Sequence, residues 1–185
     1  MRTFVAIDLN TQIRGNLSEL IGRLRGCRSN IKWVRVEMTH ITLKFLGDIR
    51  EERMPELKTA VREVCERHAA FTVSFRGTGA FPPRSSAPRV LWVGIDQSEN
   101  LSALHRDLEI RLEKMHFPRE KRKFNPHLTI GRVKKKENLF PVLEELVKHR
   151  DVHFGDLNVQ RVIIFKSTLK PSGAEYTKIA ESRLK

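Results

Sequence analysis

Two histidines are each followed, two residues later, by a threonine inside a short apolar run. The first unit is His40–Leu43 (His-Ile-Thr-Leu) and the second is His127–Ile130 (His-Leu-Thr-Ile). Because successive side chains of a strand point to opposite faces, the histidine and the threonine of one unit share a face, and the apolar residues share the other. Each unit therefore predicts a strand with one polar face and one apolar face.

Two imidazoles that face a common point suit in-line displacement at phosphorus. The ordinary pKa of histidine, about 6.5, allows one ring to accept a proton while the other donates one near neutral pH. One ring would deprotonate the attacking water and the other would protonate the departing oxygen, while the hydroxyls of Thr42 and Thr129 donate to phosphate oxygens. This chemistry requires neither a metal nor a cofactor, and the sequence places no third zinc ligand at suitable spacing beside His40 or His127.

The charge of the chain predicts a polyanionic partner. Its 185 residues include 35 Lys and Arg against 22 Asp and Glu, a formal net charge of +13, which favours nucleic acid before an anionic membrane. Basic residues gather around His127: between Pro118 and Lys136 the single acid is Glu120, and the basic residues are Arg119, Lys121, Arg122, Lys123, Arg132, Lys134, Lys135 and Lys136. A basic run alone is usually a solvated surface, but its position beside a candidate catalytic histidine favours contact with phosphates.

The rest of the composition indicates a reduced, water-soluble protein. Cys27 and Cys65 belong to no Cys-x-x-Cys pair and no zinc-spaced cluster. The sequence shows no charged-then-apolar leader and no apolar run of membrane length, so we expect a cytoplasmic protein without a membrane partner. We also expect a monomer with one domain over residues 1–185. Five histidines lack a threonine partner and are expected to be structural or exposed: His68, His105, His116, His149 and His153.

The apolar pattern predicts an α+β fold. Strands are expected over residues 2–9, 31–36, 40–46, 71–75, 89–95, 152–169 and 175–184, and helices over 13–24, 54–64, 101–115 and 139–147. Residues 77–88, rich in Gly, Pro and Ser, predict a loop, and residues 170–173 predict a hairpin turn. Each half of the chain contains strands, helices and one His-x-Thr strand. We therefore expect two pseudo-symmetric lobes, with mainly antiparallel sheets flanked by helices and an active-site cleft between them.

A set of segments, in order along nearly the whole chain, resembles one family. The segments are Trp33, His40–Gly47, Gly79–Pro82, Val90–Gly94 and Phe124–Arg132. Together they resemble the bacterial and archaeal RNA 2′,3′-cyclic phosphodiesterases, also called 2′-5′ RNA ligases, of the two-histidine phosphoesterase superfamily. The resemblance implies a bilobal α+β fold and metal-independent opening of a terminal 2′,3′-cyclic phosphate to a 2′-phosphate, with reversible 2′-5′ joining of RNA ends. The implied partner is RNA with such an end, for which tRNA halves are one source.

The resemblance also implies roles for particular residues. His127 would activate water, His40 would protonate the leaving 3′-oxygen, and Thr42 and Thr129 would hold the phosphate, although the residues themselves leave the acid and base roles open. Arg132 matches a basic position that contacts the phosphate in the family.

Arg132 does not fit simple strand geometry. Strict alternation would place it on the face opposite His127, unless a bulge at Gly131 redirects it. Further candidate RNA contacts are Lys44, Phe81, Phe124 and Lys123. Alternation places Lys44 on the face of His40 and Phe45 on the core face, and it places Trp92 in the core.

Two other classes of function share part of this pattern. A non-catalytic RNA- or nucleotide-binding module would keep the cleft and the basic surface, but it would not need two acid–base residues in matched settings. A phosphoesterase with a histidine nucleophile would form a phosphohistidine, which trapping would detect. The sequence contains neither the Lys-x-Asp-Gly pattern nor the phosphate loop of nucleotide-activated ligases.

Overall fold

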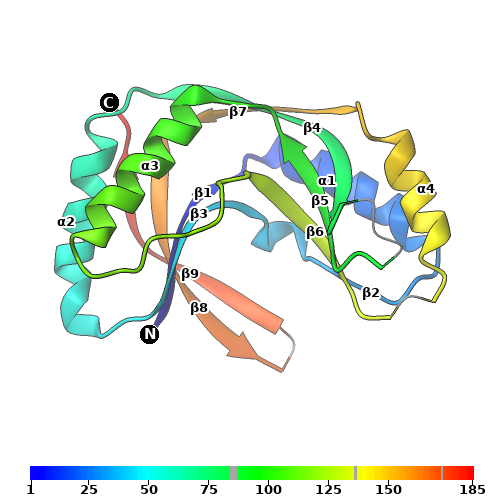
Figure 1. Ribbon diagram of the computed structural model, residues 1–185, viewed down its shortest axis with the longest axis horizontal. Coiled ribbons are helices and arrows are strands. Elements are labelled where there is room, and N and C mark those ends of the chain that lie inside the picture. The colour runs from blue at the N-terminus through cyan, green and yellow to red at the C-terminus, as the bar shows by residue number, and fades with distance from the viewer. Residues whose placement is uncertain (84–86, 136, 172) are drawn as a thin grey trace.

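The computed structural model describes residues 1–83, 87–135, 137–171 and 173–185. The fold is α+β, as predicted, and consists of two antiparallel sheets with helices packed beside them (Figure 1). Within the described residues, no helix is both long enough and apolar enough to cross a membrane.

The first sheet carries His40 and is called the His40 sheet below. Its strands, in spatial order, are β3 (His40–Asp48), β1 (Arg2–Asp8), β8 (Arg161–Lys170) and β9 (Gly173–Arg183). Two helices pack against it, α2 (Met54–Cys65) and α3 (Glu99–Glu113). Strands β8 and β9 form a hairpin that projects from the body of the molecule in Figure 1.

The second sheet carries His127 and is called the His127 sheet. Its strands, in spatial order, are β2 (Ile31–Trp33), β6 (His127–Val133), β5 (Val90–Ile95), β4 (Phe71–Phe81) and β7 (His153–Val159). Helices α1 (Thr11–Arg25) and α4 (Phe140–Lys148) pack against it (Figure 1). Short 3-10 turns, η1 (Val36–Met38) and η2 (Glu51–Arg53), precede β3 and α2 respectively.

The helices begin and pack where their sequences indicate. The side chain of Asn10 caps α1 by accepting a hydrogen bond from Ile13 N at 2.9 Å, and Ser98 caps α3 in the same way. Buried residues of α1 recur at helical spacing and join a hydrophobic cluster that includes both Leu43 of β3 and Leu128 of β6. Residues of the two sheets therefore share one core.

The expected strand over 152–169 is in fact two strands of different sheets. β7 ends at Val159 in the His127 sheet, and β8 begins at Arg161 in the His40 sheet. Neither sheet is built from one half of the chain, because the His40 sheet contains both β1 and β9 and the His127 sheet contains both β2 and β7. The expected loop also starts later than residue 77, since β4 continues to Phe81. Residues 84–86 of that loop, Lys136 of the basic run and Ser172 of the expected turn lie outside the described residues.

Candidate active site

The two histidines are the first residues of strands that contact each other. His40 begins β3 and His127 begins β6. The chain that leads toward His40 first runs beside β6, where Val34 N–H donates to the carbonyl of Ile130 at 3.0 Å. The fold thus joins the two His-x-Thr units, which are 87 positions apart in the sequence.

In each unit the histidine and the threonine share one face, as predicted. Residues directly opposite each other on antiparallel strands point to the same side. His40 and Thr42 lie opposite Asp8 and Ala6 of β1, whereas His127 and Thr129 lie opposite Gly94 and Trp92 of β5. All four side chains are half-buried, while the apolar residues between them are buried.

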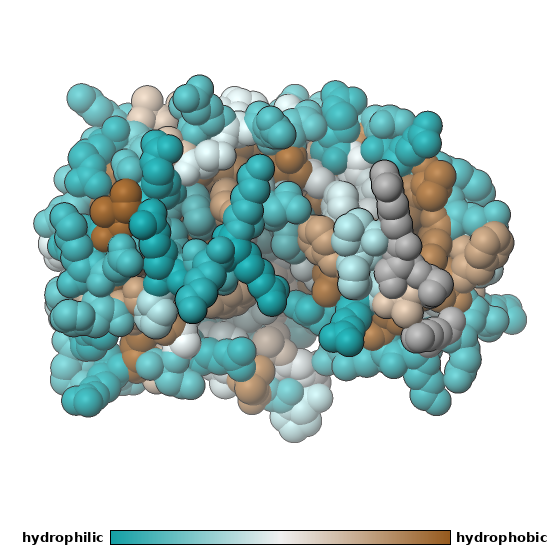
Figure 2. All heavy atoms as spheres, in the orientation of Figure 1, coloured by the Kyte–Doolittle hydropathy of each residue, from teal (hydrophilic) through white to brown (hydrophobic). Residues whose placement is uncertain are grey.

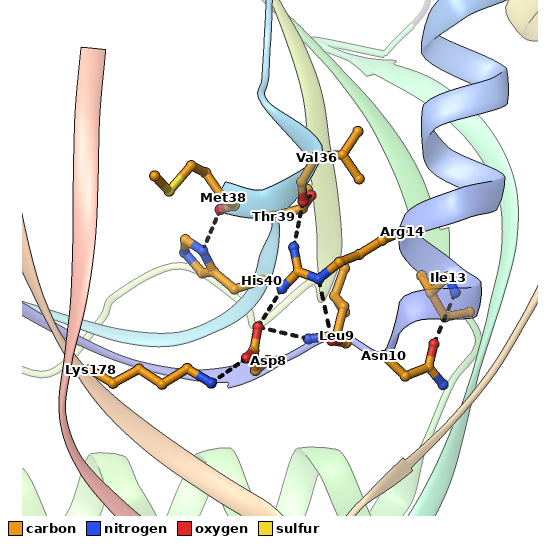
Figure 3. Close-up of polar contacts among 10 residues, drawn as sticks. All are labelled: Asp8, Leu9, Asn10, Ile13, Arg14, Val36, Met38, Thr39, His40 and Lys178. Carbon is orange, nitrogen blue, oxygen red and sulfur yellow. Dashed lines mark hydrogen bonds and ion pairs between the residues drawn. The ribbon is translucent and has the colours of Figure 1, made fainter. Parts of the chain in front are cut away.

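Both imidazoles are oriented by the same kind of contact. Nδ1 of His40 lies 2.9 Å from the carbonyl oxygen of Met38 (Figure 3), and Nδ1 of His127 lies 2.8 Å from that of Asn125. Because a carbonyl can only accept, each Nδ1 carries a hydrogen and donates it. Nε2 is therefore the nitrogen available for proton transfer in both rings.

His40 lies in an aromatic environment. Its ring stacks on Phe4 at 4.6 Å between centroids and meets the edge of Tyr176 at 5.2 Å. Burial lowers the pKa of His40 below its ordinary value, and the hydrogen bond to Met38 only partly opposes this effect. In the substrate-free protein, His40 is therefore neutral at pH 7.

An ion-pair network supports the turn that precedes His40 (Figure 3). The carboxylate of Asp8 lies 2.5 Å from Nη2 of Arg14 and 2.7 Å from Nζ of Lys178. Arg14 also donates from Nη1 to the carbonyl of Val36 at 2.5 Å. Since Val36 is the first residue of η1, the network fixes the backbone from which His40 emerges.

His127 lies beside two aromatic rings of its own sheet. The rings of His127 and Phe81 are nearly perpendicular with 5.2 Å between their centroids, and the centroids of Phe81 and Trp92 are 5.3 Å apart. The prediction that Trp92 belongs to the core is wrong, because Trp92 lies opposite Thr129 on the site face and is half-buried. Its indole covers Gly79, where an added Cβ would collide with the ring.

A bulge returns Arg132 to the face of His127. The register of β6 against β5 shifts by one residue between Thr129 and Gly131, so one residue of β6 is extra. Alternation restarts after an extra residue, which reverses the face expected for Arg132. The bulge predicted at Gly131 is thereby confirmed, and the side chain of Arg132 is exposed on the side of the histidine.

A similar shift in β3 overturns the expected positions of Lys44 and Phe45. The register against β1 changes between Thr42 and Lys44, so that Lys44 points into the core and Phe45 points to the face of His40. Phe45 is 70% exposed, whereas Lys44 is 5% exposed. The prediction that Lys44 shares the His40 face and meets RNA is therefore wrong, because alternation counted from His40 does not survive the bulge.

Lys44 instead forms a buried ion pair. Its Nζ donates to both carboxylate oxygens of Glu109 and to the carbonyl of Pro118, each at 2.8 Å. The carboxylate of Glu109 also accepts from Glu120 N at 3.0 Å. The pair thus attaches the strand of His40 to the segment that leads to His127.

The other predicted RNA contacts differ in their surroundings. Phe81 borders His127, whereas Phe124 packs on the core and stacks on His105 at 3.8 Å between ring centroids. Lys123 is exposed, as are the neighbouring basic residues Arg119, Lys121 and Arg122. Figure 2 shows long hydrophilic side chains over the middle of this face, where Figure 1 shows the segment between α3 and β6.

The sequence prediction did not include Phe4, Asp8, Tyr176 or Lys178 on the His40 face, and it placed Phe45 in the core. One signal was available for Phe45, which follows His40 at the same spacing of five residues as Arg132 follows His127. No sequence signal connects Tyr176 or Lys178 to His40, because β9 reaches the site only through the order of strands in the sheet.

The described side chains can supply proton transfer and anion binding. The Nε2 atoms of the two histidines can each accept a proton from a substrate or donate one to it. The two threonine hydroxyls and the guanidinium of Arg132 can donate hydrogen bonds to an anion. Among the described residues, no group of three His, Cys, Asp or Glu side chains could hold a metal ion. A cavity of about 550 Å³ lies at the end of β3 that is distant from His40, and none of its lining residues belongs to a His-x-Thr unit.

Curated relatives match the chain over almost all its length. It is 36% identical over 185 residues to the RNA 2',3'-cyclic phosphodiesterase of Methanothermobacter thermautotrophicus, covering 100% of this chain and 99% of the relative. The protein of the same name from Archaeoglobus fulgidus is 37% identical over 177 residues, which are 95% of this chain and 96% of that protein.

Solved structures show the same fold. The Thermus thermophilus protein TT0787 superposes with a TM-score of 0.84 at 29% identity, covering 100% of this chain and 98% of that one. Escherichia coli LigT, complexed with 3'-AMP, superposes with a TM-score of 0.81 at 23% identity, covering 99% and 97%. The family model of the 2'-5' RNA ligase superfamily matches residues 14–169. The chain therefore belongs to the 2'-5' RNA ligase superfamily, which is a superfamily of enzymes.

Proposed function

We propose that this protein is an RNA 2′,3′-cyclic phosphodiesterase that opens a terminal cyclic phosphate to a 2′-phosphate. The observation that carries the proposal is the matched orientation of His40 and His127, each with Nδ1 bound to a carbonyl and a threonine on the same face. Relatives that match the chain from end to end carry the corresponding name.

The reaction is an in-line displacement at phosphorus. In the assignment implied by the resemblance, Nε2 of His127 takes a proton from water, the water oxygen bonds to phosphorus, and the bond from phosphorus to O3′ breaks. Nε2 of His40 gives a proton to O3′. Thr42, Thr129 and Arg132 donate to the non-bridging oxygens, where charge develops in the transition state.

The lowered pKa of His40 bears on this assignment. A neutral His40 in the free protein suits a base, whereas the proposed role is that of an acid. The negative charge of a bound phosphate favours the protonated ring and so raises this pKa again. The two assignments predict opposite protonation states of His40 in the productive complex, which a pH–rate profile combined with NMR titration of His40 separates.

The surroundings of the two histidines suggest where RNA lies. Phe45 lies on the face of His40, and Tyr176 contacts the ring of His40. Aromatic rings of this kind stack on unpaired bases. The exposed basic side chains around Lys123 are placed to meet the RNA backbone. RNA ends such as those of tRNA halves, a monomeric state and a cytoplasmic location stay predictions from the sequence. The core shared by both sheets supports a single bilobal domain.

The test uses a short RNA that ends in a 2′,3′-cyclic phosphate, incubated with the protein in excess EDTA. We expect a 2′-phosphate product from the unaltered protein and a loss of at least about 10²-fold in both His40→Ala and His127→Ala. The matched control is His153→Ala, because His153 is an exposed histidine paired with Asp156 on β7. RNA binding without turnover would support the binding module instead, and a trapped phosphohistidine would support the nucleophilic mechanism.

A further inference from the structure

A pocket of about 220 Å³ lies beside His127 on the His127 sheet. Its lining residues include Arg76, Phe81, Trp92, Gly94, Asn125 and His127. They come from β4, β5, the end of the α3–β6 segment and β6, and none of the pocket's lining residues belongs to the His40 sheet. The pocket therefore opens on one histidine only.

The walls of this pocket suit a nucleoside. The rings of Phe81 and Trp92 provide aromatic surface. At Gly94, an added Cβ would collide with the carbonyl oxygen of Arg76 and press on the ring of Trp92. Arg76 uses Nε and Nη1 for Asp96 and for the carbonyl of Asp151, and a guanidinium has further donors. Aromatic faces with a few hydrogen-bond donors are the chemistry that recognises a base.

In-line geometry decides which nucleoside belongs here. The attacking and leaving oxygens lie on opposite sides of phosphorus, and the nucleoside with the cyclic phosphate carries the leaving O3′ toward His40. A group in the pocket lies instead on the side of His127, from which the attacking oxygen comes. We propose that the pocket is the subsite for an acceptor nucleoside with a free 5′-hydroxyl; this inference rests on the function proposed above and on its assignment of His127 as the base.

The resulting step is balanced without any further reactant. The 5′-hydroxyl of the acceptor gives its proton to Nε2 of His127, and its oxygen forms a bond to phosphorus. The bond from phosphorus to O3′ breaks, and O3′ takes the proton of His40. The product is a 2′-5′ phosphodiester that contains every atom of both substrates, and the acceptor simply replaces water.

The experiment measures how the protein divides a cyclic phosphate between water and an acceptor. Adenosine 2′,3′-cyclic phosphate is incubated with an RNA trinucleotide that has a 5′-hydroxyl, and the 2′-phosphate and the 2′-5′-joined product are separated by chromatography. Arg76→Ala should lower the ratio of joined to hydrolysed product about tenfold, and Trp92→Leu, which removes the aromatic surface, should lower it several-fold. The matched control is Arg161→Ala, since Arg161 is as exposed as Arg76 and is also paired with a carboxylate.

The other possible outcomes contradict either the acceptor subsite or the proposed function. A parallel fall of both products in the pocket variants would overturn the acceptor subsite and assign the pocket to the nucleoside with the cyclic phosphate. An unchanged ratio would also overturn it. If the unaltered protein forms neither product, the proposed function fails, and with it the inference that depends on it.

Discussion

Phe45 and Arg132 are structural counterparts. Each lies five residues after a histidine of the candidate pair, and each follows a bulge that returns its side chain to the face of that histidine. One offers a flat apolar ring and the other a cation, so equivalent positions in the two sheets present different chemistry. On the function proposed above, we expect a bound nucleotide to take one orientation, with its base toward Phe45 and its phosphate within reach of Arg132.

Replacing Arg132 by alanine should lower kcat/KM for a 2′,3′-cyclic nucleotide about 10²-fold, because a preorganised donor to the developing phosphate charge is lost. Arg132→Lys should recover part of the loss, since it restores the charge but not the forked geometry. Steady-state kinetics with Arg161→Ala as the control measures both effects. Unchanged kinetics in Arg132→Ala would remove Arg132 from the site.

Replacing Phe45 by alanine should raise KM for the cyclic nucleotide about tenfold, since stacking on a base contributes about 1–3 kcal/mol. The value of kcat should change little, because the ring does not contact the reacting atoms. Phe140→Ala is a close control: Phe45 and Phe140 are each 70% exposed, but Phe140 lies on α4. Equal effects of the two substitutions would contradict a role for Phe45 in binding.

Breaking the buried pair between Lys44 and Glu109 should destabilise the protein. Lys44→Met leaves an uncompensated carboxylate whose side chain is 4% exposed, at an expected cost of about 3–5 kcal/mol in the free energy of unfolding. The double variant with Glu109→Leu should recover most of that loss. Urea denaturation measures these changes, and Lys148→Met, which breaks an exposed pair with Glu145, should have little effect. A double variant no more stable than Lys44→Met would contradict this account.

Acid should weaken the fold through His40. Burial lowers the pKa of His40 in the folded state, so the unfolded chain binds a proton more readily. The free energy of unfolding should therefore fall as the pH drops below about 6.5, the ordinary pKa of histidine, and should be unaffected by this residue above that pH. His40→Gln should reduce the slope between pH 5 and 6.5 in denaturation experiments. The slope should not vanish, because burial also lowers the pKa of His105. An unaltered slope in His40→Gln would show that His40 does not contribute.

The local patterns of the sequence predicted the elements and the pairing of each histidine with its threonine. Alternation failed where a strand gains a residue. The bulge at Gly131 could be anticipated, because glycine tolerates such a position and Arg132 otherwise faced the wrong way. The bulge between Thr42 and Lys44 is marked only by the spacing that Phe45 shares with Arg132. Leu43 carries no local signal of irregularity, and a lysine outside with a phenylalanine inside is the ordinary expectation.

Features that depend on which strands become neighbours could not be predicted from the sequence. The contact between Asp8 and Lys178 exists only because β1 and β9 both pair with β8. The pattern of residues 152–169 predicts one strand, because no residue near Gln160 signals that the chain leaves one sheet and enters the other. Trp92 was assigned to the core because its neighbours Leu91 and Val93 are apolar, although they face the other side of β5.

The position of β1 between β3 and β8 has a consequence for synthesis of the protein. One edge of β1 pairs with β3, which follows closely in the sequence. The other edge of β1 can pair only after residues 161–170 have been made, and the ring contact of His40 with Tyr176 forms later still. Domains dominated by pairings this distant in the chain fold slowly. During translation, both histidines are therefore made before the strands that complete the surroundings of His40.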